Sequence, residues 1–222
     1  MNNTEKARSK IRLRLVCLLR LRCKMFKAVL FDADGVILLP RKKYFSDIIA
    51  EDYGVPLEQV LPLFKNEFKE CLIGKADLKE VLNNKYLNKW GWRGSAEELL
   101  VYWWRGEGQI NKPVLDLIKE LREKGVRCFL AADQEKYRAD HLLKTLELEK
   151  FLDGAFISCN MGVGKNNRTF FERILTDLKL EPEEVLFWDD EEENIAVARQ
   201  VGIDARLFTL DSPQDYSIEI KM

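Results

Sequence analysis

The ten residues KAVLFDADGV, at positions 27–36, consist of a short apolar run that leads directly into an acidic turn. An apolar run of this length is typical of a strand that is buried on both faces, as in a parallel sheet. Asp32 and Asp34 follow at its carboxyl end, where open α/β sheets bind ligands, and Gly35 permits the chain to reverse. Two carboxylates this close need a cation, and their hard oxygens favour Mg²⁺. A turn with two solvated aspartates is the alternative.

Four further apolar runs predict the other strands of the same sheet, at residues 126–131, 155–157, 185–188 and 205–208. Helical patterns lie between these runs, including one from Asn111, a candidate N-cap, to Lys124. Because strands and helices alternate, we predict an α/β fold with a Rossmann-like parallel sheet and helices on both of its faces.

Residues 41–107 interrupt this alternation, because they contain helical patterns and no convincing strand. Ser95 and Glu98 form a capping-box pattern ahead of one of these helices. Four tryptophans in this stretch supply bulk for a small helical core or for contact with the main domain, an interpretation that we favour over stacking on a substrate: Trp90, Trp92, Trp103 and Trp104. The sequence therefore predicts an α/β core at 25–40 and 108–222, with an inserted all-helical cap at 41–107.

Composition argues against several classes of protein. The net charge of −1 over 222 residues provides no global field for nucleic acid or for an anionic membrane. Five scattered cysteines without a CxxC pair, and a single histidine, argue against a zinc site, a disulfide framework and a histidine-based triad. Reduced thiols suit the cytoplasm, which is the predicted location. The composition predicts no oligomeric state.

Residues 1–24 are basic, with eight lysines and arginines against one acidic residue. Their longest uncharged run, at 15–19, is too short to cross a bilayer or to form the apolar part of a signal peptide. They are either a basic anchor for an anionic surface or for nucleic acid, or a dispensable extension upstream of a start at Met25. We favour the extension, disordered or non-native, because the globular pattern begins at Met25.

A second acidic cluster strengthens the case for a cation site. The apolar run at 185–188 ends directly in Asp189 and Asp190, while the glutamates that follow suit a helix N-terminus. Lys165 lies between the two clusters, in the Gly-rich turn at 161–165. It is either a ligand for an anionic phosphate and a nearby carboxylate or an exposed loop lysine.

These elements, in this order, resemble the haloacid dehalogenase superfamily. Its motif I matches residues 31–36, its motif III lysine matches Lys165, and its motif IV acidic pair matches Asp189 and Asp190. Residues 130–134 align with motif II, so that the resemblance covers roughly residues 25 to 209. The insert at 41–107 looks like the helical C1-type cap of the phosphatase and phosphoglucomutase-like branch.

The resemblance implies an Mg²⁺-dependent phosphatase that hydrolyses a small phosphorylated metabolite through an aspartyl-phosphate. Asp32 would be the nucleophile, Asp34 the acid and base, and Lys165 the partner of the nucleophile and the phosphate. The implied metal ligands are Asp32, Asp34 through its backbone carbonyl, Asp190 and an assisting Asp189. A phosphomutase acting on a sugar phosphate would use the same residues.

Two departures from the family pattern stand out. Ala132 replaces the motif II serine or threonine, which removes a hydroxyl hydrogen bond to phosphate worth about 1.5–3 kcal/mol. A backbone N–H, such as that of Asp133, remains to bind phosphate there. Asn166 replaces the proline that commonly follows the motif III lysine. Ala132 therefore leaves open a slower enzyme or a catalytically degenerate binding module.

Three basic residues follow motif I at the hinge into the cap: Arg41, Lys42 and Lys43. The sequence makes Lys42 and Lys43, together with the segment at Ala132 and Asp133, the candidate substrate-binding residues. The alternative for the hinge lysines is that they are solvated.

Overall fold

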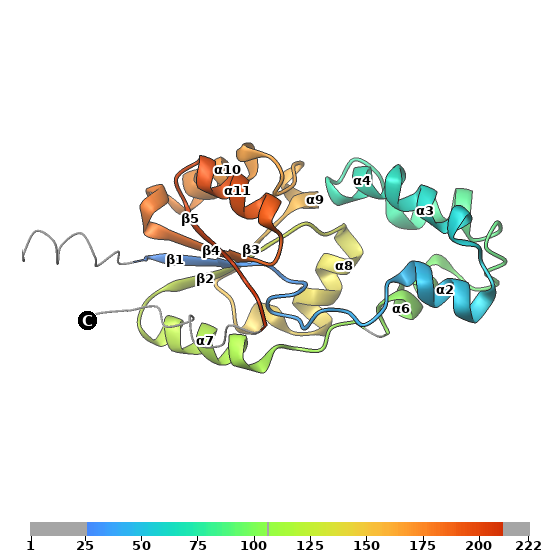
Figure 1. Ribbon diagram of the computed structural model, residues 1–222, viewed down its shortest axis with the longest axis horizontal. Helices are drawn as coiled ribbons and strands as arrows, with labels where there is room; N and C mark the ends of the chain where they lie inside the picture. The colour runs from blue at the N-terminus through green and yellow to red at the C-terminus, as the bar shows by residue number, and fades with distance from the viewer. Residues whose placement is uncertain (1–25, 106, 211–222) are drawn as a thin grey trace, which may run out of the picture.

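The computed structural model describes residues 26–105 and 107–210, and the extension predicted at 1–24 lies outside these ranges. The described chain forms an α/β unit beside a group of helices (Figure 1). A five-stranded sheet with the order β3-β2-β1-β4-β5 organises the α/β unit, and all of its pairs are parallel. Its strands are β1 Ala28–Phe31, β2 Arg127–Ala132, β3 Gly154–Ile157, β4 Val185–Asp189 and β5 Asp204–Leu207. All five predicted strands are present, each within one residue of its expected bounds.

Helices cover both faces of this sheet, as predicted. In Figure 1, α10 and α11 lie on one side and α7 on the other. The helical segments of the α/β unit are α7 Lys112–Glu123, α8 Lys136–Asp140, η2 His141–Thr145, η3 Leu148–Lys150, α9 Ser158–Met161, α10 Arg168–Leu178, η4 Pro182–Glu184 and α11 Glu192–Gln200. The fold class is therefore confirmed as a Rossmann-like α/β fold.

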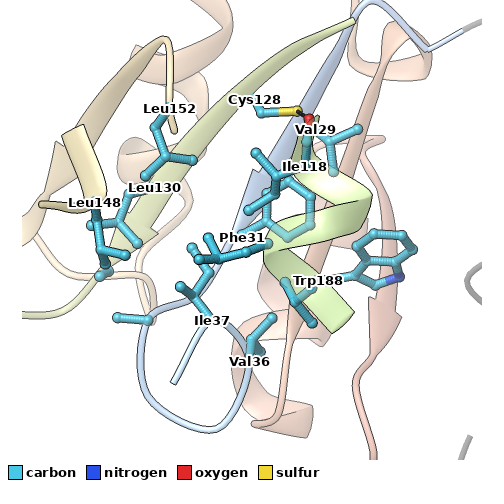
Figure 2. Packing of buried hydrophobic residues seen from close by; sticks show 14 of the residues in the cluster. Val29, Phe31, Val36, Ile37, Ile118, Cys128, Leu130, Leu148, Leu152 and Trp188 are labelled. Atoms are coloured by element: carbon cyan, nitrogen blue, oxygen red, sulfur yellow. Dashed lines mark hydrogen bonds between the residues drawn. The ribbon is translucent and has the colours of Figure 1, made fainter. Parts of the chain in front are cut away.

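Strand alternation divides the buried residues into two layers. Val29 and Phe31 of β1 point to the α7 side, where they share a cluster with Ile118 (Figure 2). Ala28 and Leu30 point to the other side, which is filled by apolar residues of α10 and α11. Because both faces of β1 are buried, the segment is apolar throughout, and its polar residues can begin only where the strand ends.

One helix start differs from its predicted detail. Asn111 occupies the N-cap position of α7, but its side chain makes no capping hydrogen bond. The side-chain amide instead donates to the backbone carbonyl of Val36 at 3.0 Å. Asn111 thus ties the start of α7 to the loop after β1, because a buried amide satisfies its hydrogen bonds wherever an acceptor is available.

The helices between β1 and α7 form a cluster with its own buried core. They are α2 Phe45–Tyr53, α3 Leu57–Lys65, α4 Glu67–Leu72, α5 Leu78–Val81, η1 Leu82–Tyr86 and α6 Ala96–Trp104. Phe45 stacks on Trp103 at a ring separation of 4.3 Å, and the predicted capping box of Ser95 and Glu98 begins α6. The helices of this cap lie within residues 41–107, the stretch in which the sequence shows no strand pattern.

Specific contacts join the cap to the α/β unit. The Ser158 hydroxyl donates to the carbonyl of Leu72 at 2.6 Å, and the Tyr137 hydroxyl donates to Asp77 at 2.9 Å. Lys136 forms an ion pair with the same aspartate. These bonds dock α4 and α5 of the cap onto α8 and α9, over the carboxyl edge of the sheet.

Among the helices in the described ranges, none combines the length and the apolar character that crossing a bilayer requires.

Candidate active site

Three carboxylates converge where the central strands end. Asp32 follows β1, Asp189 is the last residue of β4, and Asp190 comes next. Because β1 and β4 are parallel neighbours, both strands deliver their terminal side chains to the same edge. One oxygen from each carboxylate lies within 4.8 Å of the others, a separation that one metal ion can span.

Lys165 binds two of these carboxylates. Its Nζ donates to Asp32 Oδ1 at 2.5 Å and to Asp189 Oδ2 at 2.6 Å, and its side chain is only 4% exposed. The backbone N–H of Lys165 donates to the carboxylate of Asp133 at 3.0 Å, which fixes the loop. The alternative of an exposed loop lysine is therefore wrong.

Asp189 is held by more partners than Lys165 alone. Its Oδ1 accepts a hydrogen bond from the backbone N–H of Glu191 at 2.8 Å, and the buried Asn194 amide donates to its carboxylate at 3.2 Å. Asp189 is fully buried, whereas Asp190 is exposed. Of the acidic pair, Asp190 therefore remains accessible to a ligand, and Asp189 orients Lys165.

The electrostatics of the cluster show an excess of negative charge. Burial raises the pKa of Asp32 well above its usual value, an effect that Lys165 only partly offsets and that Asp189 reinforces. Although Asp190 as a whole is exposed, partial desolvation of its carboxyl group raises its pKa, again with a contribution from Asp189. Although burial opposes the charge on Lys165, the carboxylates of Asp32 and Asp189 raise the pKa of its ammonium group. Three carboxylates face one ammonium, so a divalent ion with oxygen ligands fits this site.

The carboxylate of Asp34 is not part of that group of three. It accepts a hydrogen bond from Gln134 Nε2 at 2.9 Å and forms ion pairs with Arg41 at 3.0 Å and Arg138 at 3.5 Å. These partners hold the side chain apart from Asp32, Asp189 and Asp190. The sequence therefore located Asp34 correctly at the site, but the side chain contacts arginines and not the carboxylate cluster.

Arg138 and Glu107 are site residues that the sequence did not reveal. Arg138 Nη2 lies 3.1 Å from Glu107 Oε2, and both side chains are only 5% exposed. Arg41 Nη1 also approaches Glu107 at 3.6 Å. A single arginine in a short helix carries no distinguishing signal. A hint to these residues is that oppositely charged side chains, Arg41 and Glu107, stand at the two ends of the predicted insert.

The predicted substrate-binding residues are placed unevenly. Asp133 borders the cavity above the cluster, whereas Ala132 is fully buried and does not line it. Lys42 and Lys43 do not line the cavity either; Lys43 pairs with Glu51 at 2.6 Å on an exposed surface. Lys43 has a local partner on α2, and Lys42 is not among the residues that border the cavity, so a substrate-binding role for these two lysines stays a prediction. Arg41 is the hinge residue that borders the cavity.

The cavity itself has a volume of about 570 Å³ and lies between the cap and the α/β unit. Asp32, Lys165 and Asp190 are at its core side. Its walls include residues from the cap helices and from the segment that follows β2. A small molecule enclosed here would contact the acidic cluster at one end and the cap at the other.

Comparison with curated proteins finds phosphatases. The chain is 25% identical over 187 residues to a phosphorylated carbohydrates phosphatase of Thermotoga maritima, covering 80% of this chain and 82% of that protein. It is also 25% identical over 186 residues to a sesquiterpene phosphatase of Aspergillus oryzae, covering 82% of this chain and 89% of the relative.

Comparison with solved structures agrees on the fold. A haloacid dehalogenase family enzyme of Bacteroides thetaiotaomicron, in complex with magnesium and inorganic phosphate, superposes with a TM-score of 0.72 at 21% identity. The match covers 83% of this chain and 94% of that one. The family model for haloacid dehalogenase-like hydrolases matches residues 26–202. The chain therefore belongs to the haloacid dehalogenase-like hydrolase family.

Proposed function

We propose that this protein is an Mg²⁺-dependent phosphatase that hydrolyses a small phosphorylated metabolite through an aspartyl-phosphate intermediate. One observation carries the proposal: Asp32 lies at the end of β1, 2.5 Å from the ammonium of Lys165 and beside the carboxylates of Asp189 and Asp190. The arrangement combines a nucleophilic carboxylate, a cation and a set of hard oxygen ligands. The phosphatase relatives support the same reaction.

The metal would be held by Asp32, Asp190 and the backbone carbonyl of Asp34. Asp189 would assist by accepting a hydrogen bond from Lys165, which orients the ammonium group. When bound, Mg²⁺ would neutralise the repulsion between the anionic nucleophile and the anionic phosphate. The raised pKa of Asp32 fits this assignment, because a buried carboxylate without a sufficient counter-charge favours its protonated form.

In the first step, an oxygen of Asp32 attacks phosphorus and the bond between phosphorus and the ester oxygen breaks. Asp34 transfers its proton to that oxygen, so that the alcohol leaves neutral. The ammonium of Lys165, already 2.5 Å from Asp32, stabilises the negative charge on the phosphoryl oxygens.

In the second step, a water molecule loses a proton to Asp34 and attacks the phosphorus of the aspartyl-phosphate. The bond between phosphorus and Asp32 breaks, which releases inorganic phosphate and restores the carboxylate. Gln134, Arg41 and Arg138 hold the Asp34 side chain in place between the two steps. The cap above the cavity limits access of bulk water during the reaction.

The test is hydrolysis of an aryl phosphate, with and without Mg²⁺, by the wild type and by Asp32→Asn. We expect turnover that requires the metal and falls by at least a thousandfold in Asp32→Asn, because the amide is not a nucleophile. Absence of turnover across a broad panel of phosphate esters would favour a binding module, the alternative that Ala132 supports. Recovery of a rearranged phosphate ester in place of inorganic phosphate would identify a phosphomutase.

A reducing compartment suits the free thiols of Cys71, Cys128 and Cys159. Burial raises the pKa of Cys71 and of Cys128 to about 12, so that neither forms a reactive thiolate near neutral pH. We therefore propose a cytoplasmic location for the enzyme.

A further inference from the structure

The cap contributes a strongly apolar wall to the cavity. Every lining residue that comes from helices α3, α4, α5 and α6 is aliphatic or aromatic: Phe64, Phe68, Leu72, Leu78, Trp103 and Trp104. Phe64, Phe68, Leu72 and Trp104 are half-buried and belong to the cap, whereas Asp32 and Lys165 belong to the α/β unit. The cavity is therefore divided into an ionic end and an apolar end.

The polar side chains that border this space are largely engaged with one another. Gln134 donates to Asp34, and Arg138 binds Asp34 and Glu107. The Glu135 carboxylate accepts hydrogen bonds from the backbone N–H groups of residues 137 and 138. Within the described chain, two polar atoms of residues that line the cavity make no hydrogen bond: Glu107 Oε1 and Arg138 Nη1. Both atoms are buried from solvent. These groups are thus engaged or buried, and the other polar residues of the lining, among them Arg41, Tyr44, Asp133, Asp190 and Glu191, do not come from the helices of the cap.

We propose that the preferred substrate is the phosphate monoester of an apolar alcohol, whose hydrocarbon part packs against the apolar wall of the cap. This inference rests on the proposed phosphatase function and adds the class of the leaving group. The dianionic phosphate occupies the ionic end, beside Lys165 and the carboxylate cluster. The hydrocarbon extends toward Phe64, Phe68 and Trp104, where its burial contributes binding free energy.

A polyhydroxylated alcohol fits the same wall poorly. Each hydroxyl that leaves water without a hydrogen-bond partner is destabilising, and the aliphatic side chains and phenyl rings of this wall provide none, which leaves the indole N–H groups of Trp103 and Trp104 as its possible donors. A hydrocarbon loses nothing by the same transfer and gains about 0.8 kcal/mol for each buried methylene, or about fourfold in affinity. The wall therefore discriminates between alcohols with the same number of carbon atoms.

The experiment compares alkyl phosphates with matched polyol phosphates under subsaturating conditions with Mg²⁺. For ethyl, butyl and hexyl phosphate, we expect kcat/KM to rise by about fourfold per methylene, until the chain fills the cavity. We expect hexyl phosphate to exceed sorbitol 6-phosphate, and propyl phosphate to exceed glycerol 3-phosphate, by at least tenfold. A flat alkyl series, or preference for the polyol esters, would overturn the substrate class.

The two proposals fail in different ways. If no ester is hydrolysed, including an aryl phosphate, then the phosphatase function is wrong and the inference falls with it. If aryl and polyol phosphates are hydrolysed but the alkyl series is flat, then the function stands and only the apolar substrate class is rejected.

A pair of variants in α3 tests the wall directly. Phe64 borders the cavity, whereas Leu61 lies on the same helix, does not border it and is 37% exposed. We expect Phe64→Ala to lower kcat/KM for hexyl phosphate at least fivefold and for ethyl phosphate less than twofold. Leu61→Ala is expected to change neither value. Because ethyl phosphate reports on folding and chemistry, an equal loss for both esters in Phe64→Ala would contradict the proposal.

Discussion

Gly35 packs its Cα directly against the carboxylate of Asp190. A Cβ atom at position 35 would overlap Asp190 Oδ2, and the residue has a φ of +81°, in the left-handed region. The position therefore requires glycine both for its backbone conformation and for the space that Asp190 occupies. The glycine after the two aspartates of motif I is thus part of the site that those aspartates form.

The first prediction concerns this contact. Gly35→Ala should displace the Asp190 carboxylate and weaken Mg²⁺ binding by at least tenfold, because Asp190 is the accessible member of the acidic pair. Isothermal titration of Mg²⁺ into the purified protein measures the effect. Gly54→Ala is the matched control, since Gly54 has a φ of +65° but nothing within 4 Å of its Cβ position. Equal metal affinity in the two variants would contradict the assigned role of Asp190.

The second prediction concerns the buried cation. Lys165→Met should abolish turnover and destabilise the metal-free protein by about 3–5 kcal/mol, because Asp32 and Asp189 lose their counter-charge in a buried site. Urea unfolding without Mg²⁺ measures the stability. Adding Asp32→Asn to this variant should restore part of the loss, since one of the unpaired charges is removed.

The control for that experiment is Lys144→Met. Lys144 pairs with Asp140 on the surface, and the side chains are 67% and 61% exposed. An exposed pair of this kind contributes little to stability, so Lys144→Met is expected to leave the free energy of unfolding almost unchanged. A Lys165→Met protein as stable as Lys144→Met would show that the buried carboxylates do not depend on Lys165.

The third prediction is a pH dependence of the docking between cap and core. Asp77 accepts hydrogen bonds from the backbone of α5 and from Tyr137, and it pairs with Lys136. Although burial acts in the opposite direction, these partners lower the pKa of Asp77 to about 2. A lowered pKa means that the carboxylate stabilises the fold above its usual value near 3.8, and that this contribution is lost as the pH falls toward 2.

The variant Asp77→Asn isolates the charge, because asparagine is an equally good helix N-cap. It should destabilise the protein by about 1 kcal/mol at pH 7, and the difference from the wild type should shrink between pH 4 and pH 2. Thermal unfolding over this range is the measurement, with the exposed Asp140→Asn as control. A difference that is constant with pH would rule out the ionised carboxylate as its source.

The fourth prediction concerns the missing motif II hydroxyl. Because the Ala132 side chain is fully buried and does not line the cavity, a serine hydroxyl at this position should not reach the phosphate, and Ala132→Ser should leave kcat/KM for an aryl phosphate nearly unchanged. Ala131→Ser is the control, since the Ala131 side chain faces the opposite layer of the core. A gain of about tenfold or more, as expected from a hydroxyl hydrogen bond to a charged phosphate, would show that the side chain at position 132 does reach the substrate.

The sequence by itself determined the fold and the carboxyl-edge residues. Apolar runs bounded by aspartates and glycines are local signals, so Asp32, Asp190 and the strands that carry them could be read from short segments. The sequence also predicts Lys165 as a site residue, because its Gly-rich turn lies between the two acidic clusters along the chain. In a parallel sheet, the carboxyl ends of the strands meet at one edge, independently of the conformation of the connecting loops.

Only the tertiary structure decided the surroundings of Asp34 and the character of the substrate cavity. Arg138 reaches Asp34 across 104 positions of sequence, and no local pattern distinguishes it from other helical arginines. The sequence predicts that Lys43 faces a substrate, but its ammonium group donates a hydrogen bond to Glu51 of α2. Tryptophans 103 and 104 look alike in sequence as core residues, and the packing of the cap makes them part of the cavity wall. Side-chain contacts between distant segments depend on how the cap docks, and short-range patterns do not encode that geometry.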